Sequence, residues 1–161
     1  MTDLNRRRFL QGTGAAIAAG VLAGCTGNGN GNGNDNGGDG STEDIENHLS
    51  GANNYGGSLE DMTGESGVTI DVGAGSNGYA FDPAAVRISS GTTVTWEWTG
   101  KGGAHNVASA EDSETEFSSG KSVEGEDNEY EQSFDSAGSQ LYVCEPHIAR
   151  GMKGAIEVVG E

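Results

Sequence analysis

The sequence predicts an all-β fold, a sandwich of seven or eight short strands. Apolar and polar residues alternate in 68–72 and in 93–98, a period that buries one face of a strand and exposes the other. The alternation recurs more weakly in 130–134, 141–143 and 155–159, and turn-forming clusters separate these runs. No stretch has the long apolar period of a helix. The folded domain is therefore predicted to span residues 67–161.

Composition and charge narrow the possible functions. The apolar fraction of 33% is low for a chain of 161 residues, which predicts that part of it is unpacked. Asp and Glu number 25 against 8 Lys and Arg, a net charge of −17. Such a surface repels phosphates and disfavours nucleic-acid binding. The acidity suits a highly saline habitat, and an acidic docking face for a basic partner is the alternative.

Residues 1–24 have the features of an export signal. Residues 6–10 form an Arg-Arg-x-Phe-Leu pattern that resembles a twin-arginine signal, which exports proteins already folded. The apolar run 12–22 is too short to span a bilayer. Residues 22–25 resemble a lipobox, in which Cys25 becomes the first mature residue and carries the lipid. We therefore expect an exported protein anchored to the outer face of the cell membrane; the alternative is a plain apolar N-terminus with an incidental cysteine.

Residues 25–66 are predicted to connect this anchor to the domain. From 26 to 40 the chain is almost wholly Gly, Asn and Asp, which have no apolar side chains to bury, so a flexible tether is predicted. Residues 41–66 are polar and acidic with sparse apolar positions, and we expect a short lead-in element that packs against the domain. His48 in this segment is expected to be solvated rather than a ligand.

Three potential metal ligands lie in one loop between two predicted strands, with the spacing Cys144-x2-His147-x4-Met152. Thiolate and thioether are soft donors and imidazole is intermediate, a set that suits copper in both oxidation states. A trigonal copper site needs a second imidazole, and His105 follows the strand that ends near Trp98. Strand ends that are distant in sequence meet at one pole of a sandwich, which would bring His105 to this loop.

The neighbours of these residues fit the same interpretation. Pro146 removes an N–H, fixes its own φ and restricts Glu145 to extended conformations, which stiffens the loop. Gly151 permits a tight approach before the methionine. Asn106 can supply a backbone N–H to the Cys144 sulfur, a bond that stabilises a thiolate and tunes a reduction potential.

The same residues have other interpretations. Taken singly, a cysteine, histidine or methionine is most simply a packed side chain. Zinc is the alternative metal, but it has little use for a methionine ligand. A cysteine nucleophile leaves the position of Met152 unexplained, and a Cys25–Cys144 disulfide would join a cleavage site to a core strand. A dinuclear copper module needs two cysteines in this loop, which has one.

Taken together, these residues resemble the cupredoxins, and among them most closely the halocyanins, small blue copper proteins of halophilic archaea. The resemblance covers the signal, the lipobox and the domain, and its most specific segments besides the ligand loop are 77–83, 86–88, 94–98, 142–144 and 152–155. It implies a Greek-key sandwich and one copper ion. The implied ligands are His105, Cys144 and His147, which bind strongly, and Met152 as the long axial ligand.

Two positions depart from the family pattern. Gln140 stands where such proteins often place an aromatic residue. Arg150 adds a positive charge inside the ligand loop, where it would raise the potential or steer an acidic partner.

The resemblance also implies a function, that of a one-electron carrier which turns over no substrate. Electrons would pass through the His147 imidazole at the solvent edge, across a shallow apolar patch. The partners would be membrane-bound redox complexes, and we expect a monomer. The alternative is a copper storage or delivery protein with the same ligands, whereas an oxidase or nitrite-reducing enzyme would need further domains. Colour separates the first two, since a thiolate bound to Cu(II) is intensely blue and a Cu(I) chaperone is colourless.

Overall fold

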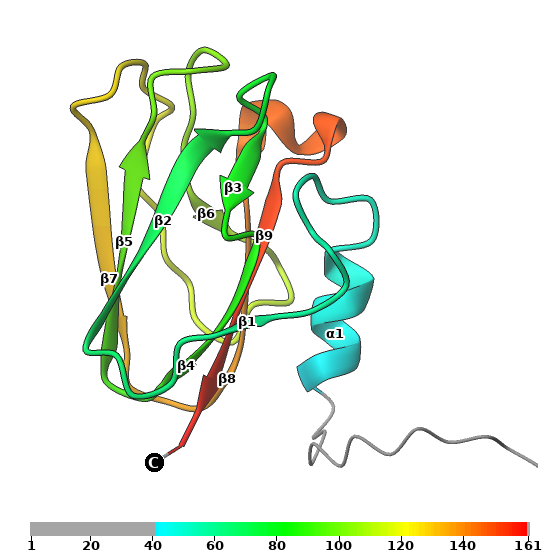
Figure 1. Ribbon diagram of the computed structural model, residues 1–161, viewed down its shortest axis with the longest axis vertical. Coiled ribbons are helices and arrows are strands. Elements are labelled where there is room, and N and C mark those ends of the chain that lie inside the picture. Colours follow the sequence, from blue (N-terminus) through cyan, green and yellow to red (C-terminus); the bar gives the residue numbers. More distant parts are fainter. Residues whose placement is uncertain (1–40, 161) are drawn as a thin grey trace, which may run out of the picture. The chain divides into compact units, whose positions relative to one another are not determined.

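Two β-sheets pack face to face in the computed structural model, which describes residues 41–160 (Figure 1). The five-stranded sheet has the order β1-β4-β9-β8-β6, with these strands at Glu60–Asp61, Ala85–Ser89, Lys153–Val159, Gly138–Val143 and Ala108–Ser109. The four-stranded sheet has the order β3-β2-β5-β7, at Ala80–Asp82, Gly67–Ala74, Thr92–Trp98 and Glu129–Phe134. The signal segment, Cys25 and the linker 26–40 lie outside the described residues.

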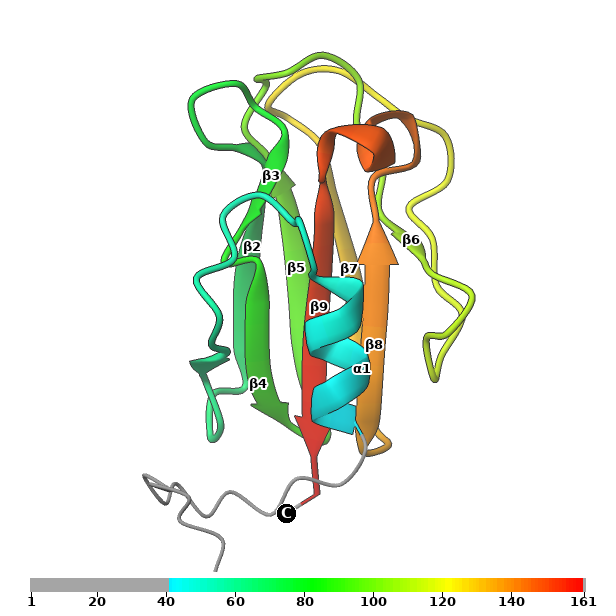
Figure 2. The same ribbon diagram turned by 90° about the vertical axis from the view of Figure 1, so that its right-hand side faces the viewer.

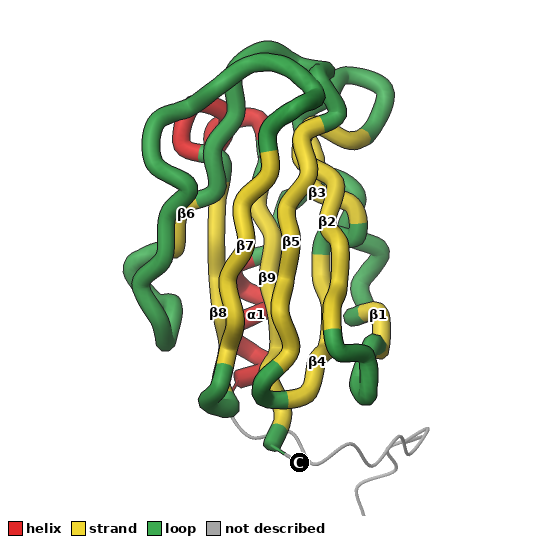
Figure 3. Tube along the Cα trace, turned by 90° about the vertical axis from the view of Figure 1, so that its left-hand side faces the viewer, coloured by secondary structure: helices red, strands yellow, loops and turns green. Residues whose placement is uncertain are grey.

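The all-β architecture is confirmed, and each of the five runs with alternating polarity forms a strand. Residues 67–160 contain eight strands, β2 to β9, in agreement with the predicted seven or eight. The ninth strand of the described residues, β1, lies before them in the lead-in segment. β2 pairs in parallel with β5, and β4 with β9, whereas β8 and β9 are antiparallel. The loops that follow β2, β5 and β8 gather at one pole of the sandwich (Figures 2 and 3).

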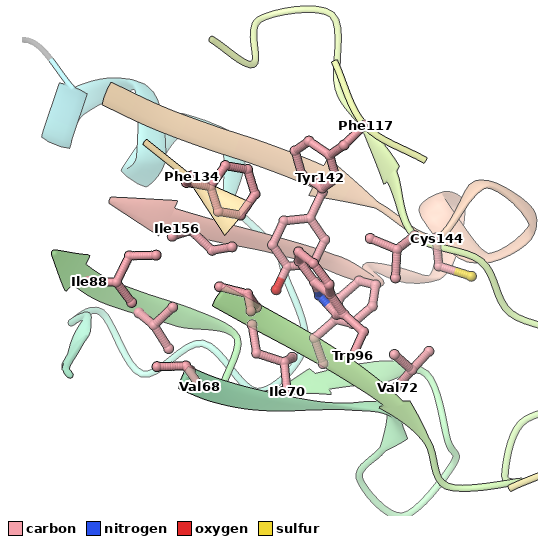
Figure 4. Packing of buried hydrophobic residues seen from close by; sticks show 14 of the residues in the cluster. Val68, Ile70, Val72, Ile88, Trp96, Phe117, Phe134, Tyr142, Cys144 and Ile156 are labelled. Atoms are coloured by element: carbon pink, nitrogen blue, oxygen red, sulfur yellow. The ribbon is translucent and has the colours of Figure 1, made fainter. Parts of the chain in front are cut away.

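Trp96 lies at the centre of the core between the sheets (Figure 4). Its ring centroid is 5.4 Å from that of Tyr142 on the facing sheet and 5.7 Å from that of Phe117. Trp96 and Trp98 are two residues apart and share one face of β5, and both are buried. Cys144 belongs to the same core cluster and lies at one end of it, so the predicted ligand loop is built directly onto the packed interior (Figure 4).

Gln140, which stands in place of an aromatic residue, is buried in β8. Its side-chain oxygen accepts hydrogen bonds from the Thr115 N–H at 3.0 Å and from the Ser113 hydroxyl at 3.4 Å. The amide therefore attaches the segment before β7 to the sheet. The strand itself is regular, because β8 pairs with β9 from Gly138 to Val143.

A short helix, α1 (Ser41–His48), covers the outer face of the five-stranded sheet (Figure 2). Ile45 and Leu49 are four residues apart and so lie on one face of this segment. Both are fully buried, in a cluster with Leu141 of β8 and Ala155 of β9. Residues after 40 thus pack on the domain, as expected of a lead-in element. Within residues 41–160 no helix combines the length and the apolar character needed to cross a membrane.

The prediction that His48 is solvated is wrong. Its side chain is half-buried, and its Nε2–H donates to the Tyr142 carbonyl in β8 at 3.0 Å. Burial lowers the pKa of His48 and the charge of Lys153 lowers it further, although the carbonyls of Tyr142 and Gly154 act in the opposite direction. The native state therefore favours the neutral imidazole.

We expect this histidine to make the protein less stable in mild acid. Because the pKa of His48 is lower in the native state than in the unfolded chain, stability falls as the pH drops below about 6.5, where the unfolded chain binds the proton first. His48→Gln keeps a donor but does not titrate. Urea unfolding near pH 7.5 and near pH 5.5 measures the difference in unfolding free energy between the two proteins. At the lower pH, His48→Gln should become more stable relative to the wild-type protein. An unchanged difference in unfolding free energy would show that His48 does not destabilise the native state in acid.

Candidate metal centre

The loop between β8 and β9 holds three of the four predicted ligands. Cys144 directly follows β8 and is extended, with φ −93° and ψ 110°, and the 3-10 helix η1 (Glu145–Arg150) comes next. Glu145 is the first residue of this helix, so the prediction that Glu145 is extended is wrong. The extended residue is Cys144, one position earlier. Pro146 stands at the start of η1, where a missing N–H costs nothing, and Gly151 (φ 82°) ends η1 in the left-handed conformation.

His105 reaches the same pole from the segment after β5. Two backbone hydrogen bonds of 2.9 Å join His105 to Val123, and the Trp98 indole N–H donates to the His105 carbonyl at 3.2 Å. The imidazole is fully buried. Its Nε2–H donates to the Lys101 carbonyl at 2.6 Å, which leaves Nδ1 unprotonated and available to a metal.

The ligand atoms of His105, Cys144 and His147 form one compact triangle. Cys144 Sγ lies 3.5 Å from Nδ1 of each histidine, and the two Nδ1 atoms are 3.1 Å apart. An atom at the centre of such a triangle is roughly 2 Å from each corner, close to the bonds of about 2.0–2.3 Å that a metal such as zinc makes with nitrogen and sulfur. Within residues 41–160, this triangle is the one group of three or more His, Cys, Asp or Glu side chains that lie close enough together to share a metal ion.

Met152, the fourth predicted ligand, returns the chain to the core beside Cys144. Its side chain is fully buried and belongs to the same core cluster as Cys144. Its carbonyl accepts from the Cys144 N–H at 3.0 Å, and its N–H donates to the His147 carbonyl at 3.3 Å. Backbone hydrogen bonds thereby join the two ends of the ligand loop. The thioether of Met152 lies in the protein interior.

The surroundings of Cys144 act on its thiol in opposite directions. Burial raises the pKa of Cys144, whereas the backbone N–H groups of Asn106 and His147 beside the thiol lower it. The Asn106 side chain adds a second connection, because its oxygen accepts from the Glu145 N–H at 2.9 Å and its nitrogen donates to the Glu145 carboxylate. Asn106 thus ties the segment after β5 to the ligand loop. Cys144 forms no disulfide.

His147 is the half-buried member of the triangle. Its ring centroid lies 4.7 Å from that of Tyr79, and the Arg150 guanidinium carbon lies 4.7 Å from the Tyr79 ring centroid. Burial lowers the pKa of His147, and the neighbouring His105 and Arg150 lower it further. The sequence interpretation did not single out Tyr79 as a site residue, although Tyr79 lies in the 77–83 segment that carries the family resemblance.

This donor set fits copper. Two imidazole nitrogens and one thiolate, with a methionine nearby, are the ligand types of trigonal blue copper sites. The group contains no carboxylate, so hard cations such as Mg²⁺ and Ca²⁺ gain little from it. Full burial of His105, Cys144 and Met152 also keeps water away from most of the site.

The chain belongs to the plastocyanin/azurin family of copper-binding proteins, whose model matches residues 68–159. A twin-arginine translocation signal matches residues 3–23. Halocyanin from Natronomonas pharaonis is 53% identical over 98% of this chain and 99% of its own length. Plastocyanin from Scenedesmus fuscus is 38% identical over 56% of this chain and 98% of its own length. Among solved structures, oxidized plastocyanin from Dryopteris crassirhizoma has a TM-score of 0.49 and 18% identity, over 56% of this chain and 99% of that one.

These matches confirm the resemblance to cupredoxins and halocyanins, which rests on the two sequence relatives and the family model. Family membership and the donor set together make one copper ion the cofactor. The signal match likewise confirms the predicted twin-arginine signal, which supports export across the membrane.

Proposed function

We propose that the protein is a one-electron carrier built on a single type 1 copper centre. Bound copper supplies the exchange between Cu(II) and Cu(I), and the protein supplies a site that rearranges little between them. The observation that carries this proposal is the buried triangle of His105, Cys144 and His147 at one end of the core. Two relatives with the names halocyanin and plastocyanin support it.

Copper would be held by His105, Cys144 and His147, with Met152 as a fourth, weaker ligand. Two neighbours would keep these ligands in place. The Asn106 side-chain oxygen accepts from the Glu145 N–H, and Pro146 lies in the first turn of the 3-10 helix that sets the distance between the cysteine and the second histidine. Because backbone hydrogen bonds hold both ends of the loop, the fold itself would position the ligand side chains.

Electron exchange is proposed to take place at His147. His105 and Cys144 are fully buried, whereas His147 is half-buried, so it is the ligand that a partner can approach. The adjacent Ile148 is 48% exposed and offers an apolar contact. Brief docking at such a surface suits membrane-bound redox complexes as donor and acceptor. The protein would turn over no substrate and so would not be an enzyme.

The export signal supports a location at the outer face of the cell membrane. We propose that Cys25 becomes the lipidated first residue, that residues 26–40 form the tether, and that the copper domain of residues 67–161 works as a monomer. The chain has 25 acidic and 8 basic residues, and this excess of acidic residues supports an origin in a halophilic archaeon. Membrane-bound partners would then lie within reach of the tethered domain.

A visible spectrum combined with redox cycling tests the electron-carrier proposal. The carrier is expected to be intensely blue with Cu(II), to lose the colour on addition of one electron equivalent, and to regain it on reoxidation without losing metal. A storage or delivery protein with the same ligands would hold Cu(I), stay colourless and give up its metal readily. That second result would overturn the proposal.

Met152→Gln tests the fourth, weaker ligand. A carboxamide oxygen is a harder donor than a thioether and favours Cu(II), so the site should stay coloured while its reduction potential falls. We expect a fall of about 60 mV or more, which is a tenfold shift of a one-electron equilibrium. Redox titration measures it, with Met62→Gln as the control because Met62 packs beside β4 outside the loop. Equal reduction potentials in the two variants would contradict the proposal that Met152 is a ligand.

A further inference from the structure

A turn that lies outside the family match holds the ligand loop from the side. Residues 49–54 follow α1, and Figures 1 and 2 both place this turn next to the loop that contains η1. The Asn53 backbone N–H donates to the Gly151 carbonyl at 2.8 Å. Its side-chain Nδ2 donates to two further carbonyls, those of Arg150 and Tyr79, each at 2.7 Å. Both hydrogens of one carboxamide are therefore used on two different segments.

These two segments surround His147. Tyr79 belongs to the loop between β2 and β3, and Arg150 is the last residue of η1. Their side chains stack on each other at 4.7 Å, and the Tyr79 ring packs against the His147 ring at the same centroid distance. Since Asn53 holds the backbones of Tyr79 and Arg150 together, it fixes the ring that rests on the imidazole.

The turn is itself attached to the sheet, so Asn53 acts from a fixed position. The Lys153 ammonium donates to the His48 and Ser50 carbonyls, at 3.2 and 3.4 Å, where α1 ends. The approach to the ligand loop is also close. A Cβ atom on Gly151 would lie 2.6 Å from the Gly51 carbonyl oxygen, so only glycine fits there.

We infer that Asn53 is a positioning residue for the metal-binding loop and acts on His147 through Tyr79 and Arg150. The lead-in segment from α1 to this turn then helps to position the metal-binding loop, in addition to connecting the domain to the residues before it. The inference rests on the proposed function for its purpose, because an electron carrier gains from an imidazole that stays in place when the metal changes charge. The chemistry requires an amide, since a carboxylate cannot donate and would face two carbonyl oxygens.

Asn53→Asp tests the inference, because it keeps the shape of the side chain and removes both donors. Asn77→Asp is the matched control: Asn77 is exposed in the same loop as Tyr79 and makes no side-chain hydrogen bond within residues 41–160, yet it receives the same charge. In the metal-free full chain, amide exchange at residues 147–153 is expected to be about tenfold faster in Asn53→Asp than in the control. Exchange in β5 and β8 should be equal in both. With copper bound, electron self-exchange should be severalfold slower in Asn53→Asp alone.

Equal amide exchange at 147–153 in the two variants would overturn the inference. A uniform rise over all amides would do so too, because it indicates lower overall stability without a local effect on the loop. Both outcomes leave the proposed function standing. The proposed function fails on a different observation, a wild-type protein that forms no blue Cu(II) site.

Discussion

Replacement of Cys144 by serine is expected to abolish the blue absorption band of the copper-loaded protein. The band arises from charge transfer between a thiolate and Cu(II), and Cys144 Sγ lies 3.5 Å from the Nδ1 atoms of both His105 and His147. Serine has nearly the size of cysteine, but its hydroxyl is a hard and weakly acidic donor. The band should therefore disappear completely and not merely shift, as a titration with Cu(II) followed in the visible range would measure.

Cys25→Ser is the matched control, because it removes the other cysteine of the chain and leaves the ligand loop intact. Its spectrum should equal that of the wild-type protein. Far-ultraviolet circular dichroism of Cys144→Ser checks that the sandwich has formed. A folded Cys144→Ser protein that keeps the band would refute the ligand assignment.

Removal of the central indole is expected to have the largest effect on stability. Trp96 is fully buried, and its ring lies within 6.5 Å of those of Phe117, Phe134 and Tyr142, from both sheets and a loop. Trp96→Ala should lower the free energy of unfolding by about 3–5 kcal/mol, since it deletes this packing and leaves a cavity. Urea unfolding of the metal-free protein measures the loss.

Two further variants keep this test decisive. Glu97→Ala changes the next residue of β5, which is exposed, and should alter stability by no more than about 0.5 kcal/mol. Trp96→Phe retains a ring and should lose less than Trp96→Ala, so it remains measurable if the alanine variant does not fold. A loss below about 1 kcal/mol in Trp96→Ala would mean that the sheets do not pack around this residue.

The strands and the ligand loop were predictable because their signals are local. In 93–98 the alternation of apolar and polar residues coincides with burial of one face of β5. The spacing from Cys144 to Met152 needs only one loop between adjacent strands. His105 required a further step, the rule that distant strand ends meet at one pole, and its imidazole does lie 3.5 Å from Cys144 Sγ.

The lead-in segment was less predictable because its contacts are not local. In the segment 41–49, Ile45 and Leu49 are the large apolar residues of the buried face, and two apolar residues four apart are a weak helix signal. His48 bonds to a carbonyl 94 residues away, and Asn53 bonds to carbonyls 26 and 97 residues away. Backbone carbonyls leave no trace in a sequence, so a polar residue that binds them looks like any other residue of a turn.

Anomalous diffraction at the copper edge, from crystals of the copper-loaded protein, tests the central claim most directly. We predict one copper peak per chain, within about 2.3 Å of Cys144 Sγ and of Nδ1 of His105 and His147, with the Met152 sulfur as a more distant neighbour. A peak that contacts only one of these residues, or that lies elsewhere on the chain, would contradict the proposed copper site.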